Sequence, residues 1–139
     1  MGRATAVEAL DRLRDAAAAG QLDDMLVTHG VGLLVAFGSA ARGEQGPRDL
    51  DLAYSSLTER AVDVLGLLGA LEDHTGSDLL DLLDLDRANV VAAARALTRC
   101  VPLYEATAGL FAAAQLRAAM VFADTRWMRA AQLRALSAG

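Results

Sequence analysis

The feature that most constrains the fold is a pair of strand-like segments joined by a short connection. Residues 31–37 (VGLLVAF) form a continuous apolar run with the length of a buried strand. Residues 49–54 (DLDLAY) form a second strand, in which polar and apolar residues alternate up to Ala53. Between them, SAARG predicts one helical turn that begins at Ser39, and EQGPR predicts a loop. Because the connection is short, we expect the two strands to lie side by side.

The rest of the chain predicts helices around a small sheet. Hydrophobic spacing predicts helices over 5–19, 21–29, 58–73 and 87–99, and a third strand over 79–85. Residues 101–105 (VPLYE) predict an extended link because Pro102 breaks regular structure. We therefore predict a single domain over residues 1–139 with an α/β (α+β) fold, in which helices cover a small mixed β-sheet. Its core spans about residues 30–105, and a C-terminal helical segment follows over 107–136 as one long helix or two.

Composition limits which cellular compartment and which kinds of binding partner we expect for this chain. The single cysteine excludes an intrachain disulfide framework, and no secretory signal or membrane-length apolar run is visible, so we expect a cytoplasmic protein without a membrane partner. The net charge is −5, aromatic residues make up only 4%, and all 13 basic residues are arginine. Such an acidic chain is a poor binder of nucleic acid, and a basic protein is the better electrostatic partner.

Asp49 and Asp51 are the first candidates for chemistry. Alternation along a strand places both carboxylates on one face, whereas Leu50 and Leu52 point to the other. Two like charges on one face need water or a cation, and a hard cation such as Mg²⁺ accepts carboxylate oxygens together with substrate phosphates. The alternatives are a solvated edge strand, or Asp49 capping a turn.

Gly38 and Ser39 are the second candidate pair. A strand that ends in Gly-Ser and turns into a helix leaves backbone N–H groups free to bind phosphate, although Ser39 could simply cap the helix. The short connection would bring a phosphate held there to a metal held by Asp49 and Asp51. A nucleotidyl-transfer site needs this juxtaposition.

A third carboxylate is expected from a neighbouring strand. Asp81 and Asp84 lie in the segment 79–85, where alternation places them on opposite faces, and Asp78 precedes it. Spacing alone does not choose among the three.

The sequence GSAARGEQGPRDLDLAY resembles the G-S-x-A-R-G…[S]-D-x-D-[LI] signature of the minimal nucleotidyltransferase (MNT) family, within the polymerase-beta-like superfamily. The downstream DLLDLDRANVVAAARALTRCVPLYEA also resembles that family, and the similarity extends over roughly residues 30 to 136. It implies a polymerase-beta-like nucleotidyltransferase fold.

The resemblance also implies roles for individual residues. Gly38 and Ser39 would bind the triphosphate, Asp49 and Asp51 would hold Mg²⁺, and Asp81 would complete a catalytic and metal-binding triad. Arg42 would contact a phosphate, or is a helix-surface arginine without a role. Arg48 departs from the family, which usually has a small polar residue before the first aspartate; it would pair with an acid or a phosphate, or point to solvent.

Members of the MNT family resemble antitoxins that act on HEPN-domain ribonucleases. The resemblance implies a nucleotidyltransferase that uses ATP and Mg²⁺ to transfer AMP to a tyrosine hydroxyl of a HEPN toxin. One alternative is a non-catalytic antitoxin that masks the toxin by binding it. Another is an antibiotic-modifying nucleotidyltransferase that acts as a homo-oligomer: its own dimer supplies the part of the acceptor site that a second, helical domain supplies in larger relatives.

The C-terminal segment carries two apolar stripes. Leu116, Met120, Ala123, Trp127 and Ala131 form one, and Ala114, Ala118 and Phe122 form the other. We expect both to pack internally in so small a domain, and the alternative is that one of them binds a partner.

Overall fold

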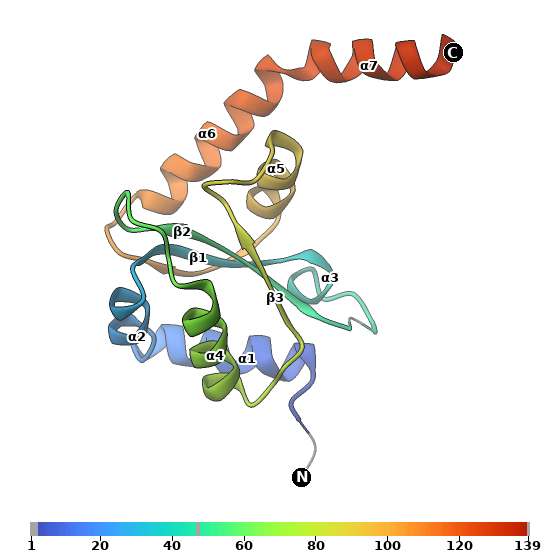
Figure 1. Ribbon diagram of the computed structural model, residues 1–139. Coiled ribbons are helices and arrows are strands. Elements are labelled where there is room, and N and C mark those ends of the chain that lie inside the picture. The colour runs from blue at the N-terminus through green and yellow to red at the C-terminus, as the bar shows by residue number, and fades with distance from the viewer. Residues whose placement is uncertain (1–2, 47, 139) are drawn as a thin grey trace.

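The computed structural model describes residues 3–46 and 48–138, whose strands form a single mixed sheet in the order β3-β2-β1-β4 (Figure 1). The strands are β1 (Val31–Phe37), β2 (Leu50–Ser56), β3 (Leu80–Asp84) and β4 (Val101–Glu105). β1 pairs antiparallel with both β2 and β4, whereas β2 and β3 are parallel. β1 therefore lies inside the sheet with its first six residues buried, which explains why its sequence is apolar without alternation.

Helices cover both faces of this sheet (Figure 1). The helices on one face are α1 (Ala6–Ala18), α2 (Asp23–Thr28) and α4 (Val64–Thr75). Those on the other are α5 (Val90–Thr98) and α6 (Leu110–Asp124), and the short α3 (Gly38–Ala41) follows β1 directly. The last helix, α7 (Arg126–Ala138), projects away from the rest of the molecule. None of the described helices is long and apolar enough to cross a membrane.

The core is divided between the two faces of the sheet. On the face covered by α1 and α4, Leu50 and Leu52 of β2 pack with leucines of both helices. On the other face, Leu33, Val35 and Ala53 pack with α5. Alternation along β2 thus sends its leucines into the larger core and leaves the intervening positions, Asp51 included, on the side of α5 and α6.

The structure confirms the fold class and corrects three elements. The helix predicted from residue 58 begins at Val64, where the Asp63 carboxylate accepts a hydrogen bond from Gly66 N (3.2 Å). Thr58 instead accepts from Arg60 N (3.3 Å), a local turn that competes with helix. The predicted link 101–105 is the strand β4, and Pro102 is tolerated there because this strand lies at the edge of the sheet and, among the described strands, pairs with β1 alone.

The third correction concerns the C-terminal segment, which forms two helices separated at Thr125. Neither contains a buried residue. The stripe with Ala114 and Ala118 packs partly against the smaller core, but Leu116, Met120 and Trp127 are exposed. The expectation that both stripes pack internally is therefore wrong for the first stripe and for Phe122 of the second, which is also exposed.

The substitution Leu52→Ala tests the position of the main core. Leu52 is fully buried in the larger cluster, so we expect the free energy of unfolding to fall by about 2–5 kcal/mol, measured by chemical denaturation. Leu65→Ala is the matched control, because Leu65 is 81% exposed and should change the free energy by less than about 0.5 kcal/mol. Equal losses in the two variants would contradict this packing.

Candidate active site

The turn after β1 lies directly against a carboxylate. The register of β1 and β2 pairs Phe37 with Asp51, and the chain then turns at Gly38 with a φ of 78°. A Cβ atom on Gly38 would collide with Asp51 Oδ2, so only glycine lets this backbone approach the carboxylate. The α3 turn has no side-chain cap at Phe37, and Ser39 is partly exposed at its start. The first N–H groups of the α3 turn therefore have no acceptor within the helix and no side-chain cap.

Two of the predicted acids are neighbours across the sheet. The parallel register of β2 and β3 pairs Asp51 with Asp81, so both side chains lie on the face opposite Leu50 and Leu52. Asp49 precedes β2, which begins at Leu50, and is exposed. Geometry thus favours Asp81 among the three candidates that spacing left open, in agreement with the resemblance.

The electrostatics of the site centre on Asp51. Partial burial raises the pKa of its carboxyl above the ordinary value, the charges of Asp81 and Asp49 raise it further, and Arg42 opposes them. Within the described part of the chain, the carboxylates of Asp49, Asp51 and Asp81 have no hydrogen bond or ion pair. Three acids that repel one another and form no ion pair with a described residue are well suited to hold a cation from outside.

These residues fit Mg²⁺ through two carboxylates rather than three. Among the described residues, no group of three or more His, Cys, Asp and Glu side chains is arranged to hold a metal ion by itself. Mg²⁺ keeps most of its waters and is bound in nucleotide sites by one or two carboxylates together with substrate phosphates. Asp51 and Asp81, side by side on adjacent strands, supply that number, and Asp49 adds negative charge beside them.

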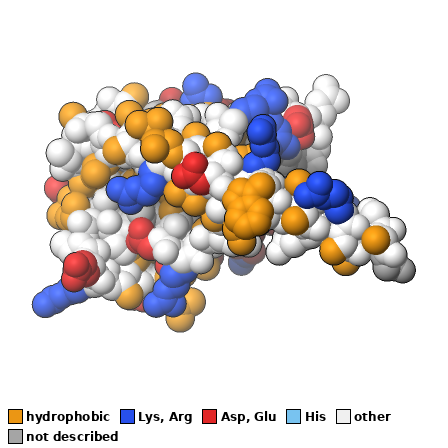
Figure 2. Space-filling model, turned by 90° about the horizontal axis from the view of Figure 1, so that it is seen from above, with side chains coloured by type: hydrophobic (Ala, Val, Ile, Leu, Met, Phe, Trp, Pro, Cys, Tyr) orange, Lys and Arg blue, Asp and Glu red, His pale blue; other side chains and the backbone are white. Residues whose placement is uncertain are grey.

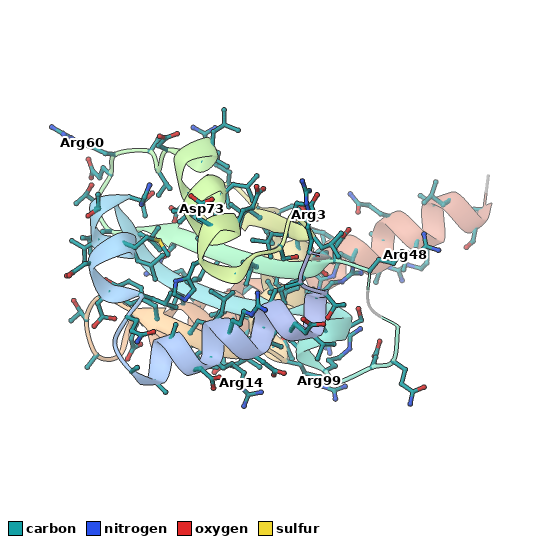
Figure 3. The ribbon with its side chains drawn as sticks, turned by 90° about the horizontal axis from the view of Figure 1, so that it is seen from below. Arg3, Arg14, Arg48, Arg60, Asp73 and Arg99 are labelled. Carbon is teal, nitrogen blue, oxygen red and sulfur yellow. The ribbon has the colours of Figure 1, made fainter. Side chains whose placement is uncertain are left out.

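The two arginines near the site differ in their contacts. Arg42 caps the end of α3 and makes a bidentate pair with Glu44, from Nε to Oε1 (2.8 Å) and from Nη2 to Oε2 (3.3 Å). The hydrogen bond to Glu44 raises the pKa of Arg42, and the charge of Asp51 adds to this effect. Arg48, on the segment that leads into β2 (Figure 3), is exposed and has no ion pair with a described residue.

The remaining candidate acids have structural partners elsewhere. Asp78 forms an ion pair with Arg3. Asp84 pairs with Tyr54 in the register, on the face opposite Asp81, and accepts a hydrogen bond from Asp86 N (2.9 Å). The local contacts of Asp78 and Asp84 therefore account for both residues without a role beside Asp51.

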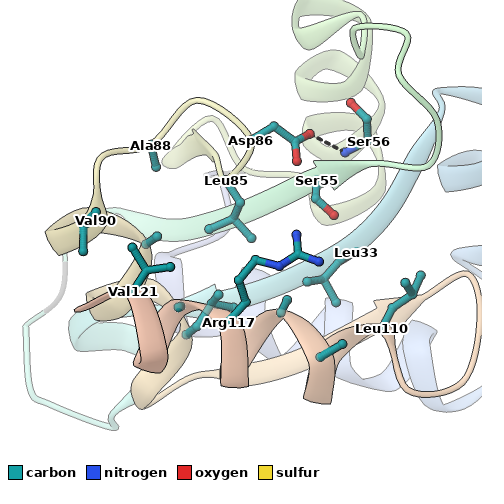
Figure 4. Close-up of a pocket in the computed structure, with 15 residues that line it drawn as sticks. Leu33, Ser55, Ser56, Leu85, Asp86, Ala88, Val90, Leu110, Arg117 and Val121 are labelled. Atoms are coloured by element: carbon teal, nitrogen blue, oxygen red, sulfur yellow. Dashed lines mark hydrogen bonds between the residues drawn. The ribbon is translucent and has the colours of Figure 1, made fainter. Parts of the chain in front are cut away.

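A cavity that the sequence did not predict lies on the same face of the sheet as Asp51 (Figure 4). It has a volume of about 350 Å³ and lies between the far end of β2, the start of α5 and the helix α6. Arg117 reaches across it toward Ser55, and Asp86 lies at its rim, where its carboxylate accepts a hydrogen bond from Ser56 N (2.8 Å). Ser55 lies four residues along β2 from Asp51, about 13 Å away, so the cavity is separate from the acids.

Comparison with known proteins links this geometry to a fold. No protein-family model matches the sequence, and no curated protein is significantly similar to it. Solved structures do match: a toxin–antitoxin structure with AMP-PNP has a TM-score of 0.68 and 20% identity, over 85% of this chain and 97% of that chain. A tri-AMPylated Shewanella oneidensis HEPN toxin in complex with MNT antitoxin gives a TM-score of 0.63 and 20% identity, over 85% of this chain and 94% of that chain. The chain has the fold of the MNT antitoxins.

A third match supports the same assignment. The toxin–antitoxin complex MntA-HepT gives a TM-score of 0.63 and 18% identity, over 85% of this chain and 95% of that chain. The MNT fold therefore extends over almost the whole length of each matched chain. The fold that the GSAARG and DLD motifs predicted is confirmed, although the sequences have diverged widely.

Gly38→Ala tests the close approach of the turn to Asp51. Alanine at a positive φ is strained by about 1–2 kcal/mol, and here its Cβ would also displace the carboxylate. Gly43→Ala is the matched control, since Gly43 has a φ of 72° but a Cβ atom added there would meet no heavy atom within 4 Å. We expect Gly38→Ala to lower the free energy of unfolding by more than Gly43→Ala does. Equal losses would mean that the contact with Asp51 is unimportant.

Asp51→Asn tests the repulsion among the acids. The pKa of Asp51 is higher in the folded than in the unfolded chain, so the folded state binds the proton more tightly, and the free energy of unfolding falls as pH rises through this window. We expect Asp51→Asn to unfold at a higher temperature than the wild type near neutral pH. The difference in melting temperature between Asp51→Asn and the wild type should vanish at a pH below about 3.9, the ordinary pKa of an aspartate in an unfolded chain.

The control for this experiment is Asp73→Asn, an exposed acid on α4 (Figure 3). Its melting temperature should follow that of the wild type at both pH values. A destabilised Asp51→Asn protein at neutral pH would contradict the repulsion.

Proposed function

We propose that this chain is an MNT antitoxin that transfers AMP from ATP to a tyrosine hydroxyl of a HEPN-domain toxin, with Mg²⁺ as cofactor. The observation that carries the proposal is the pair Asp51 and Asp81 on adjacent strands, set against the backbone of Gly38. The neighbours in fold support it, since one is a complex of an MNT antitoxin with a tri-AMPylated HEPN toxin and another contains AMP-PNP.

Each part of the site has a task in this reaction. Gly38 and Ser39 bind and orient the triphosphate, because the first N–H groups of the α3 turn have no helical acceptor. Asp51 and Asp81 would hold Mg²⁺, with the negative charge of Asp49 beside them, and the metal would neutralise charge on the phosphates. Arg42 is a phosphate contact in this proposal, which requires it to exchange Glu44 for the nucleotide.

The acceptor hydroxyl reaches the site from the exposed side of Asp81. The phenolic oxygen of the tyrosine attacks the α-phosphorus of ATP, and its proton passes to the Asp81 carboxylate. The bond from the α-phosphorus to the bridging oxygen breaks, so that pyrophosphate leaves and AMP remains on the tyrosine. Asp81 suits the base role because it is exposed, unpaired among the described residues and next to Asp51.

The test is incubation of the protein with α-labelled ATP, Mg²⁺ and a HEPN-domain protein as the candidate toxin. We expect label on the HEPN protein, and its loss in Asp49→Ala/Asp51→Ala or after chelation of the metal, because the triphosphate is then no longer neutralised. Asp73→Ala, which removes an exposed acid outside the site, should retain the transfer. The measurement is the amount of label on the toxin.

The same experiment separates the alternatives. A stable complex that silences the toxin without label would favour masking by binding alone. Label on an added aminoglycoside, and none on the toxin, would favour an antibiotic-modifying enzyme. Either outcome would overturn AMP transfer to the toxin.

A further inference from the structure

The helix α7 is an apolar arm that the described chain does not cover. None of its residues is buried, and Trp127, Leu133 and Leu136 are 70%, 65% and 78% exposed. Figure 2 shows hydrophobic and arginine side chains along the part that projects from the body. A helix of this length is marginal in water without tertiary packing, so large apolar side chains left exposed along it indicate that another surface covers them. We call α7 the C-terminal arm.

The direction of the arm is fixed by specific contacts at its base. Arg129 donates hydrogen bonds to Thr125 Oγ1 (2.7 Å) and to the carbonyl oxygen of Phe122 (2.6 Å). Its guanidinium also lies 3.7 Å from the centre of the Phe122 ring. These contacts join the two helices across the break at Thr125, so the arm is held outward in one direction and is preorganised to bind.

Charge separates the arm from the rest of the chain. The arm contains Arg126, Arg129 and Arg134 and no acidic residue, so it carries a charge of +3. The whole chain carries −5, which leaves −8 on residues 1–125. The arm therefore combines apolar side chains with the sign of charge opposite to that of its own body.

We propose that the C-terminal arm docks on the acidic body of a second copy of this chain and forms a homodimer. The apolar side chains supply burial, and the arginines complement the charge of −8 on the other body. A basic arm binds best to an acidic surface, and the body of this chain has that sign of charge. The basic arm therefore favours an acidic partner, and the body of a second copy of the chain is such a partner.

The test is sedimentation or light scattering of the full chain across a range of concentrations and salt. We expect self-association at low salt that weakens as salt is raised, because the arginines contribute by charge. Trp127→Ala/Leu133→Ala should raise the dimer dissociation constant by at least about tenfold, since a buried tryptophan usually dominates an interface. Arg126→Glu/Arg134→Glu should do the same through charge.

Ser137→Ala is the matched control, because its hydroxyl donates a hydrogen bond within the arm, to the carbonyl oxygen of Leu133 (2.9 Å), and contributes neither apolar surface nor charge. It should leave the dissociation constant unchanged. Circular dichroism of each arm variant checks that the body, which the arm substitutions do not enter, is still folded. The Asp49→Ala/Asp51→Ala variant should still self-associate, so failure of AMP transfer and failure of dimerisation are separate results.

Three outcomes would overturn the proposal. The first is a monomer at every concentration up to the solubility limit. The second is self-association that the arm substitutions leave unchanged. The third is loss of binding to the HEPN protein in the arm variants without any change in self-association, which would assign the arm to the toxin instead.

Discussion

The site depends on the register of three neighbouring strands. β1 pairs with β2 so that Phe37 lies beside Asp51, and β2 pairs with β3 so that Asp51 lies beside Asp81. A slip of one residue in β2 would turn Asp51 into the leucine core and Leu52 onto the open face. The register therefore has to be strongly specified, and the leucines of β2 specify it, because Leu50 and Leu52 are fully buried.

The same short segment, Leu50 to Ala53, thus serves stability and chemistry together. Its leucines contribute to the larger core, and that burial holds Asp51 where partial burial and two neighbouring carboxylates disfavour its charge. The repulsion is tolerable because the larger core lies on the other face of the strand and is not disturbed by it. A rigid strand also keeps the two carboxylates from moving apart to relieve their repulsion, which is what a cation-binding site requires.

Sequence patterns predicted the central strands and the acids of β2, because alternation and turn chemistry are local properties. They could not choose between Asp81 and Asp84, since that choice depends on the parallel register with β2, which is set at a distance. The strand β4 was missed because Pro102 argues against a central strand, and the sequence does not reveal that this strand lies at an edge. The cavity with Arg117 was invisible for a related reason: its lining comes from segments far apart along the chain.

The C-terminal segment shows a different limit of sequence reasoning. Apolar residues at helical spacing indicate that a helix buries one face, but they do not state whether the covering surface belongs to the same chain. In α6, Ala114 and Ala118 find that surface on the smaller core, whereas Leu116 lies on the opposite side of the helix and does not. Charge adds information that hydrophobicity lacks, because the arginines of α7 have no acidic neighbour within that helix. The acidic body and the basic arm favour partners of opposite charge, so in the proposed dimer the arm of each copy takes the body of the other copy as its partner.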